Sequence, residues 1–131
     1  KELPINKDHL DTEALRGQEL YAKFLDYKTN FAFLVAKAKG EYTILYREKW
    51  EYYGGKADAK VYATKPFDLK VLKADVHIYM DSDVDLQKAD QKAAYLNQVV
   101  KYLEQVLRSI NNRTFLIKNA IEWKKFTSGA I

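Results

Sequence analysis

The stretch LNQVVKYLEQVLRSI, residues 96–110, decides the fold class of this chain. Its apolar residues alternate spacings of three and four, which is the period of one face of an α-helix. They are Leu96, Val99, Leu103, Val106 and Ile110. Val100 and Leu107 widen this stripe, so the helix can pack against more than one neighbouring helix. Either the rest of the chain or a second copy of it must cover such a wide apolar surface.

Beyond this helix the sequence predicts a pause and a second amphipathic piece. Asn111, Asn112 and Arg113 indicate a bend or an interruption, because asparagine is a weak helix former. A last helical piece then runs to Phe126 and continues the apolar stripe. We predict that this C-terminal region holds an oligomer together through Leu96, Val99, Leu103, Val106, Ile110, Ile117, Ile121 and Trp123.

Residues 11–53 form a second helical region. Asp11 or Thr12 can cap its start. The apolar residues that follow at helical spacing are Leu15, Leu20, Phe24, Leu25, Phe31 and Leu34. Gly40 costs a helix about 1 kcal/mol relative to alanine, so the region is either one bent helix or two. Gly54 suits the left-handed residue that follows the end of a helix.

The two helical regions, 11–53 and 68–131, are separated by a predicted loop at 54–67, which begins at adjacent glycines and contains Pro66. In KADVHIYMDSD, residues 73–83, apolar residues alternate as in a short strand, but they also fit a helical stripe, which we favour. The sequence therefore predicts a single, mainly-α domain over residues 1–131. Its expected fold is a long helical hairpin with amphipathic C-terminal helices, and a short β segment near 70–80 is the alternative.

The composition limits the function classes. The chain has 131 residues, 47% of them hydrophobic, and a formal charge of +4, which permits a nucleic-acid partner without demanding one. It has no cysteine, which excludes disulfides, zinc ribbons and thiol catalysis. No apolar run approaches the roughly 18 residues of a membrane span, so we expect a soluble, intracellular protein without a membrane partner.

Motifs for catalysis or metal binding are missing from the sequence. His9 and His77 have no partner at the spacing of a metal site or a catalytic triad. DSDVD, residues 81–85, imitates the start of a calcium loop, but Leu86 stands where that loop needs glycine and Lys92 where it needs glutamate. No glycine-rich phosphate-binding motif is present. We therefore expect no enzyme, no metal and no cofactor.

The stretch LYREKWEYYGGK, residues 45–56, carries the candidate binding surface. On a helix, Tyr42, Tyr46, Trp50 and Tyr53 fall within an arc of about 80°. The cations beside this arc are Lys39, Arg47, Lys49 and Lys56. Aromatic rings that stack on unpaired bases, together with cations that hold phosphates, are typical of single-strand binding without sequence preference. The alternative is that the aromatic stripe is part of the core, and neighbouring glutamates dilute the charge.

Three stretches resemble one known family. REKWEYYGGKAD at 47–58, VLKADVHIYMDSDVD at 71–85 and YLEQVLRSINNRTFLIKNAIEWKKFTSG at 102–129 are similar to the UvsY-type recombination mediators of T-even-like phages. The third stretch is the most specific, and the resemblance covers roughly residues 20–130. In this family a basic pair lies on the helix just before a Tyr-Tyr-x-Gly turn. Tyr52-Tyr53-Gly54-Gly55 fixes the register, which places the pair at Arg47 and Lys49, with Glu48 between them.

The resemblance implies a phage-encoded, non-enzymatic protein that acts in the host cytoplasm. It implies that the chain binds single-stranded DNA through Arg47 and Lys49, and the helical arc of aromatic residues and cations adds Lys39, Lys56, Tyr46 and Trp50 as expected contacts. It also implies a homo-oligomeric ring of six or seven protomers, assembled through the C-terminal helices. The implied partners are a UvsX-type phage recombinase and the phage single-strand-binding protein, and the implied processes are recombination, replication and repair. The alternative is a helical scaffolding oligomer that does not bind DNA.

Overall fold

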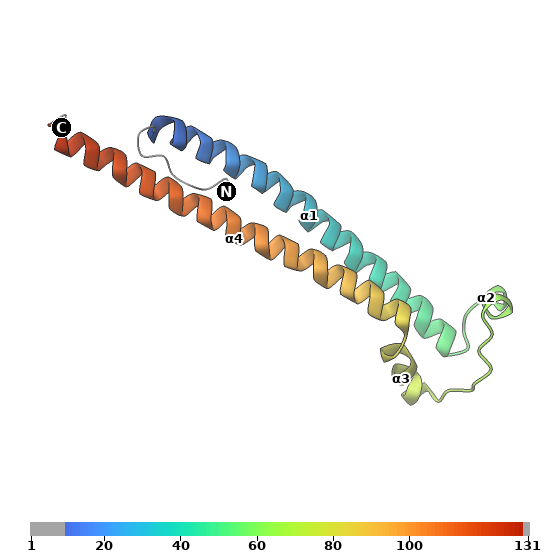
Figure 1. The fold of residues 1–131 in the computed structure, drawn as a ribbon. Helices are drawn as coiled ribbons and strands as arrows, with labels where there is room; N and C mark the ends of the chain where they lie inside the picture. Colours follow the sequence, from blue (N-terminus) through green and yellow to red (C-terminus); the bar gives the residue numbers. More distant parts are fainter. Residues whose placement is uncertain (1–9, 130–131) are drawn as a thin grey trace. The chain divides into compact units, whose positions relative to one another are not determined.

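The computed structural model describes residues 10–129, and His9 and the rest of residues 1–9 lie outside this range. The elements in chain order are α1 (Leu10–Tyr53), α2 (Ala59–Thr64), the 3-10 helix η1 (Lys73–Asp75), α3 (Val76–Asp81) and α4 (Val84–Thr127) (Figure 1). No strand occurs between residues 10 and 129. The predicted mainly-α class is therefore confirmed, and the ambiguous stretch near 70–80 is helical.

The chain divides into two compact units, and both long helices contribute to each. Unit 1 comprises residues 1–32 and 98–131, and unit 2 comprises residues 33–97. In unit 1, Glu13 pairs with Arg113 and Lys28 pairs with Glu104. In unit 2, Glu41 pairs with Lys92. Within unit 1 residue numbers rise along α1 as they fall along α4, so the two segments are antiparallel and the predicted helical hairpin is confirmed.

An ion pair inside unit 1 explains why α4 does not stop at residues 111–113. The predicted bend there is wrong, because α4 runs without interruption from Val84 to Thr127. Arg113 is buried, and its guanidinium contacts the Glu13 carboxylate at 3.2 Å. Its position continues the spacing of the buried Ile110 and Ile117. Asn111 and Asn112 are exposed. The stretch that looks like a helix breaker therefore supplies one inward residue to a regular packing face.

The packing face of α1 in unit 1 includes only part of the apolar stripe that the sequence predicts. Leu20, Phe24 and Phe31 are buried or half-buried, whereas Leu15 is 57% exposed and Leu25 is also exposed. The other buried or half-buried positions are Leu10, Glu13, Ala14, Arg16, Gly17, Tyr21 and Lys28. This face includes charged residues and a glycine, and a β-carbon at Gly17 would lie 3.5 Å from the Thr114 hydroxyl. Hydrophobicity alone therefore predicts only part of this face, because charged residues and a glycine occupy some of its positions.

Unit 2 has a small apolar core. Val76, Met80 and Leu86 are buried together, and partly buried residues surround them. The surrounding residues are Tyr42, Leu45, Tyr53 and Val71. Residues from α1, α3 and α4 thus form one cluster, which places the end of α1 next to the beginning of α4.

The ends of α1 and the loop that follows it differ in detail from the sequence-based prediction. α1 includes Leu10, so neither Asp11 nor Thr12 is its N-cap, and it passes Gly40 as one helix. It ends at Tyr53 as predicted, but Gly55 rather than Gly54 has the positive φ, 75°. The predicted 54–67 loop is corrected in part, because it contains the short helix α2.

Candidate nucleic-acid interface

The aromatic stripe of α1 divides between the core and the surface of unit 2. Tyr42 and Tyr53 pack against the apolar core, as the alternative interpretation expected. Tyr46 is 47% exposed and Trp50 is 36% exposed. Tyr42 and Tyr46 still contact each other, with ring centroids 6.1 Å apart. Only Tyr46 and Trp50, of the four predicted rings, have enough open surface to stack on a base.

Three of the predicted cations accompany the exposed rings. Arg47 and Lys39 are exposed on α1, and no hydrogen bond or ion pair of their side chains occurs within residues 10–129. Lys56 places its ammonium 4.7 Å from the centroid of the Trp50 ring. A cation over an indole face is attracted by the ring quadrupole. Trp50 and Lys56 therefore form one unit, in which a stacking ring and a phosphate-binding cation are adjacent.

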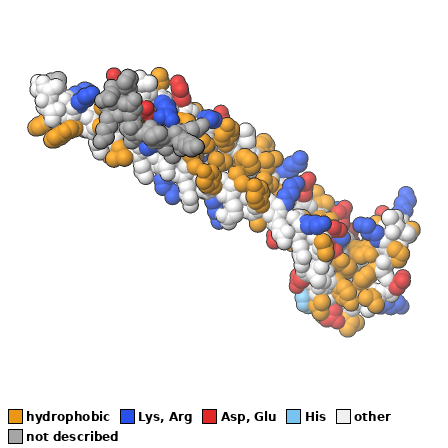
Figure 2. All heavy atoms as spheres, in the orientation of Figure 1, with side chains coloured by type: hydrophobic (Ala, Val, Ile, Leu, Met, Phe, Trp, Pro, Cys, Tyr) orange, Lys and Arg blue, Asp and Glu red, His pale blue; other side chains and the backbone are white. Residues whose placement is uncertain are grey.

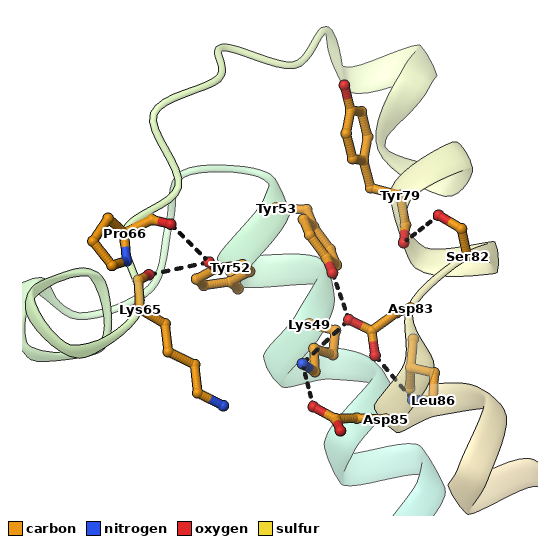
Figure 3. A network of polar contacts seen from close by, with 10 residues as sticks. All are labelled: Lys49, Tyr52, Tyr53, Lys65, Pro66, Tyr79, Ser82, Asp83, Asp85 and Leu86. Atoms are coloured by element: carbon orange, nitrogen blue, oxygen red, sulfur yellow. Dashed lines mark hydrogen bonds and ion pairs between the residues drawn. The ribbon is translucent and has the colours of Figure 1, made fainter.

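Lys49, the fourth predicted cation, is held inside the protein. Its ammonium lies 3.2 Å from Asp83 and 2.9 Å from Asp85 (Figure 3). Its side chain is 17% exposed. Burial by itself lowers the pKa of Lys49, but hydrogen bonds to Asp85 and Asp83 outweigh this effect and raise the pKa. The two members of the predicted basic pair therefore have different environments, because Lys49 is ion-paired and Arg47 is exposed.

Asp83 is the centre of this polar network. The residue is buried, directly precedes α4, and accepts a hydrogen bond from the Leu86 N–H at 2.9 Å, as an N-cap side chain does. The Tyr53 hydroxyl donates a second hydrogen bond to the carboxylate. Burial by itself raises the pKa of Asp83, but the bonds from Tyr53, Leu86 and Lys49 lower it further than burial raises it. The stretch that imitates a calcium loop thus begins a helix, and residues 10–129 contain no group of side chains suited to hold a metal.

An aromatic cluster fixes the segment that connects α1 to α3. The rings of Tyr52 and Tyr62 stack with centroids 5.4 Å apart, and Phe67 contacts both Tyr52 and Tyr53. Tyr79 completes the cluster from α3. The Tyr62 hydroxyl donates to the Tyr52 carbonyl at 2.7 Å. The sequence-based interpretation did not include Tyr62 or Phe67, although aromatic residues on both sides of a glycine turn were the available signal.

A hollow of about 790 Å³ lies beside this cluster, and basic and acidic side chains from the end of α1, the connecting segment and the start of α4 line it. Its cations are Arg47, Lys49, Lys56 and Lys65. Lys65 was not predicted from the sequence. The backbone carbonyl of Lys65 accepts a hydrogen bond from the Tyr52 hydroxyl at 3.0 Å. Tyr52, on α1, therefore fixes the backbone position of Lys65.

The predicted oligomerisation residues separate into two groups. Leu103, Ile110 and Ile117 are buried within unit 1. These three residues are therefore corrected from an intermolecular to an intramolecular role, because a side chain buried in its own chain has no surface to offer a second copy. The half-buried members are Leu96, Val99, Val106 and Ile121.

Trp123 remains available to a partner. It is 67% exposed, and its ring stacks on that of Phe126, which is also exposed, at a centroid distance of 5.8 Å. Phe115 and Leu116 are further exposed apolar residues of the same helix. Apolar side chains are visible near the C-terminal end of α4 in Figure 2. The sequence-based interpretation included Trp123 but missed Phe115, Leu116 and Phe126, because it followed the residues of the packed face.

The fold and this surface define an all-helical protein with exposed aromatic and cationic residues at the end of a long helix. A family model described as "Recombination, repair and ssDNA binding protein UvsY" matches residues 1–130. The chain belongs to the UvsY family. Its membership confirms the resemblance that the three sequence stretches carry.

Individual relatives agree with this assignment. The chain is 21% identical over 129 residues to the recombination protein uvsY of Enterobacteria phage T4, covering 98% of this chain and 91% of that protein. It is also similar to the crystal structure of the bacteriophage T4 recombination mediator protein UvsY in lattice type I, with a TM-score of 0.82, 20% identity, and coverage of 96% of this chain and 92% of that one. Lattice type IV gives a TM-score of 0.81, 20% identity, and coverage of 95% and 90%. No helix within residues 10–129 is long and apolar enough to cross a membrane.

Proposed function

We propose that this protein is a single-stranded-DNA-binding recombination mediator. In this role it loads a UvsX-type phage recombinase onto DNA that is covered by the phage single-strand-binding protein. The processes served are homologous recombination, recombination-dependent replication and repair in the host cytoplasm. Membership of the UvsY family supports the general role.

The observation that carries the proposal is the exposed group formed by Tyr46, Arg47 and Trp50 near the end of α1 and by Lys56 just after it. Stacking on Tyr46 and Trp50 requires unpaired bases, and each stacked base contributes roughly 1–3 kcal/mol. Lys56 lies over the Trp50 ring and can neutralise a phosphate, and Arg47 and Lys39 are further exposed cations on α1. This combination favours single strands over duplexes and shows little preference for sequence.

Assembly into a homo-oligomeric ring would strengthen this surface. One protomer offers few phosphate contacts, but linked copies bind one strand repeatedly, because each further contact is intramolecular once the first has formed. The exposed Trp123 and Phe126 supply apolar surface for such an assembly.

A salt titration of oligonucleotide binding tests the DNA surface. Arg47→Ala should weaken binding and make the slope of log K against log salt shallower, by about 0.7 per engaged protomer. Trp50→Ala should weaken binding with little change in slope, because stacking releases no counterions. Fluorescence anisotropy with an unstructured strand and a hairpin of equal length gives both quantities. Arg108→Ala, which removes an exposed arginine from unit 1, is the matched control.

Two results would contradict the proposal. Equal affinity for the hairpin and the unstructured strand would exclude a stacking surface. An Arg47→Ala variant that binds with unchanged affinity and slope would favour the alternative of a helical scaffold without DNA binding.

A further inference from the structure

The hollow at the end of α1 contains a lysine whose two acidic partners are unequal. Asp83 is 4% exposed at its side chain, whereas Asp85 is 54% exposed. Asp83 is also tied to Tyr53 and to the Leu86 N–H. Within residues 10–129, the carboxylate of Asp85 makes its hydrogen bond with Lys49 alone. Lys49 therefore has one permanent partner and one exposed partner that another anion can replace.

Lys65 provides a second cation at the same place. The pKa of Asp85 lies below its ordinary value, mainly because of the hydrogen bond and charge of Lys49, and the positive charge of Lys65 contributes. Figure 3 draws no hydrogen bond or ion pair to the Lys65 ammonium. The backbone of Lys65 is held by the Tyr52 hydroxyl, as described above. An anion that took the place of the Asp85 carboxylate would thus meet the ammonium of Lys49 and the nearby positive charge of Lys65.

The cations of the hollow suit a phosphodiester, and its acidic residues are Glu48, Glu51, Asp58 and Asp85. Its volume of about 790 Å³ is large enough for one phosphate group. It is continuous with Arg47 and Lys56, which line it and also belong to the exposed surface. A carboxylate and a phosphate oxygen bind an ammonium in the same way, through charge-assisted hydrogen bonds.

We propose that this hollow is a subsite for one backbone phosphate of single-stranded DNA, and that Asp85 holds Lys49 until the phosphate displaces it. Lys65 is the second cation of the subsite. The inference rests on the proposed function and deepens it, since it adds Lys65 to the predicted contacts and makes the predicted contact of Lys49 depend on release of Asp85.

Asp85→Asn is the test, because it removes the competing charge and leaves Asp83 in place. Asp85 competes with the phosphate for Lys49, and exposed ion pairs of this kind are weak. Loss of the Asp85 charge should therefore tighten binding of an unstructured oligonucleotide by about two- to fivefold. The salt slope should become steeper by about 0.7 per engaged protomer. Lys65→Ala should weaken binding and make the slope shallower. A thermal melt should show that both variants fold like the wild type, since both side chains are exposed.

Asp58→Asn is the matched control, because Asp58 lines the same hollow and the change in charge is identical. Equal gains from Asp58→Asn and Asp85→Asn would show a general charge effect and overturn the subsite, as would no gain from Asp85→Asn. Arg47→Ala separates this failure from failure of the function. If the wild type binds and Arg47→Ala weakens binding, only the subsite is lost; if the wild type does not bind, both proposals fall.

Discussion

Arg47 and Lys49 are two residues apart on one helix, and both line the hollow, but their surroundings differ. Two residues rotate a helix by about 200°, and only Lys49 contacts the carboxylates at the start of α4. The amine of Lys49 meets two carboxylates there, whereas Arg47 is exposed. Adjacent basic residues in a sequence are therefore not equivalent contacts, and mutations of the two should differ in kind.

Replacement of Lys49 by methionine should destabilise the fold. The buried Asp83 carboxylate would lose a cation and keep only its bonds to Tyr53 and Leu86, which should cost roughly 1–3 kcal/mol of unfolding free energy. Arg47→Ala should change the unfolding free energy by less than about 0.5 kcal/mol, because its side chain is exposed. Urea denaturation followed by circular dichroism measures both. Equal stability of the two variants would show that the ion pair contributes nothing.

The lowered pKa of Asp83 predicts a pH dependence of stability. A carboxyl group whose pKa is lower in the folded than in the unfolded state stabilises the protein above its unfolded pKa, and this contribution is lost as the pH falls through the folded pKa. The ordinary value is 3.8, so the unfolding free energy should decrease as the pH falls below about that value. Urea denaturation at several pH values between neutral and about pH 3 measures the decrease.

Asp83→Asn is the informative variant for this prediction. Asparagine also caps helices well, so the change removes the charge while it keeps an N-cap at α4. The variant should be less stable at neutral pH and should lose less stability on acidification than the wild type. Parallel curves for the two proteins would mean that other carboxyl groups dominate the acid dependence.

At the scale of single elements, α4 presents a packed face and an exposed face with similar apolar content. Ile110 is fully buried, whereas Leu116 on the same helix is 60% exposed. Ion pairs and a glycine complete the packed contact on α1 in unit 1. The exposed face holds aromatic residues such as Trp123. The buried residues of α4 therefore stabilise the folded protomer, and its exposed residues are available for contacts with partners.

Truncation of the two faces should have different consequences. Ile110→Ala should lower the unfolding free energy by about 2–5 kcal/mol, through lost burial and a residual cavity. Leu116→Ala should change it by less than about 0.5 kcal/mol. Denaturation must be measured at one protein concentration, because association adds a concentration-dependent term. A similar loss in both variants would place Leu116 in a contact that stabilises the folded chain.

At the scale of the whole molecule, a charge of +4 on 131 residues is small for a protein that binds a polyanion. Repetition of the same surface in an assembly raises the local field and the number of contacts on one strand. The exposed apolar residues of α4 are consistent with such an assembly, because monomeric proteins rarely leave contiguous apolar patches uncovered.

Trp123→Glu should therefore weaken assembly and leave the protomer folded. Sedimentation at micromolar concentration should show a lower mass than the wild type, and circular dichroism should show unchanged helix content. Leu72→Glu is the control, because Leu72 is 73% exposed in unit 2 and lies outside the predicted assembly residues. A wild type that sediments as a monomer, or a Trp123→Glu variant that sediments like the wild type, would contradict the prediction.

The sequence by itself determined the helical class and the family. Helical periodicity and glycine punctuation are local properties, so residues 96–110 predict a helix and Tyr52-Tyr53-Gly54-Gly55 ends one, whatever surrounds them. Motif resemblance likewise depends only on residue order. These predictions hold in the structure and in the family match.

Only the tertiary structure decided which faces are packed and which charges are already paired. Whether Lys49 is a DNA contact or an ion-pair partner depends on Asp83 and Asp85, which are distant in sequence and next to it in space. The same holds for Arg113 with Glu13, and for the aromatic residues that fix Lys65. Local sequence patterns show which residues are polar and which are apolar. Burial and ion pairing also depend on the residues of the other helix or segment in the contact, so only the tertiary structure reveals them.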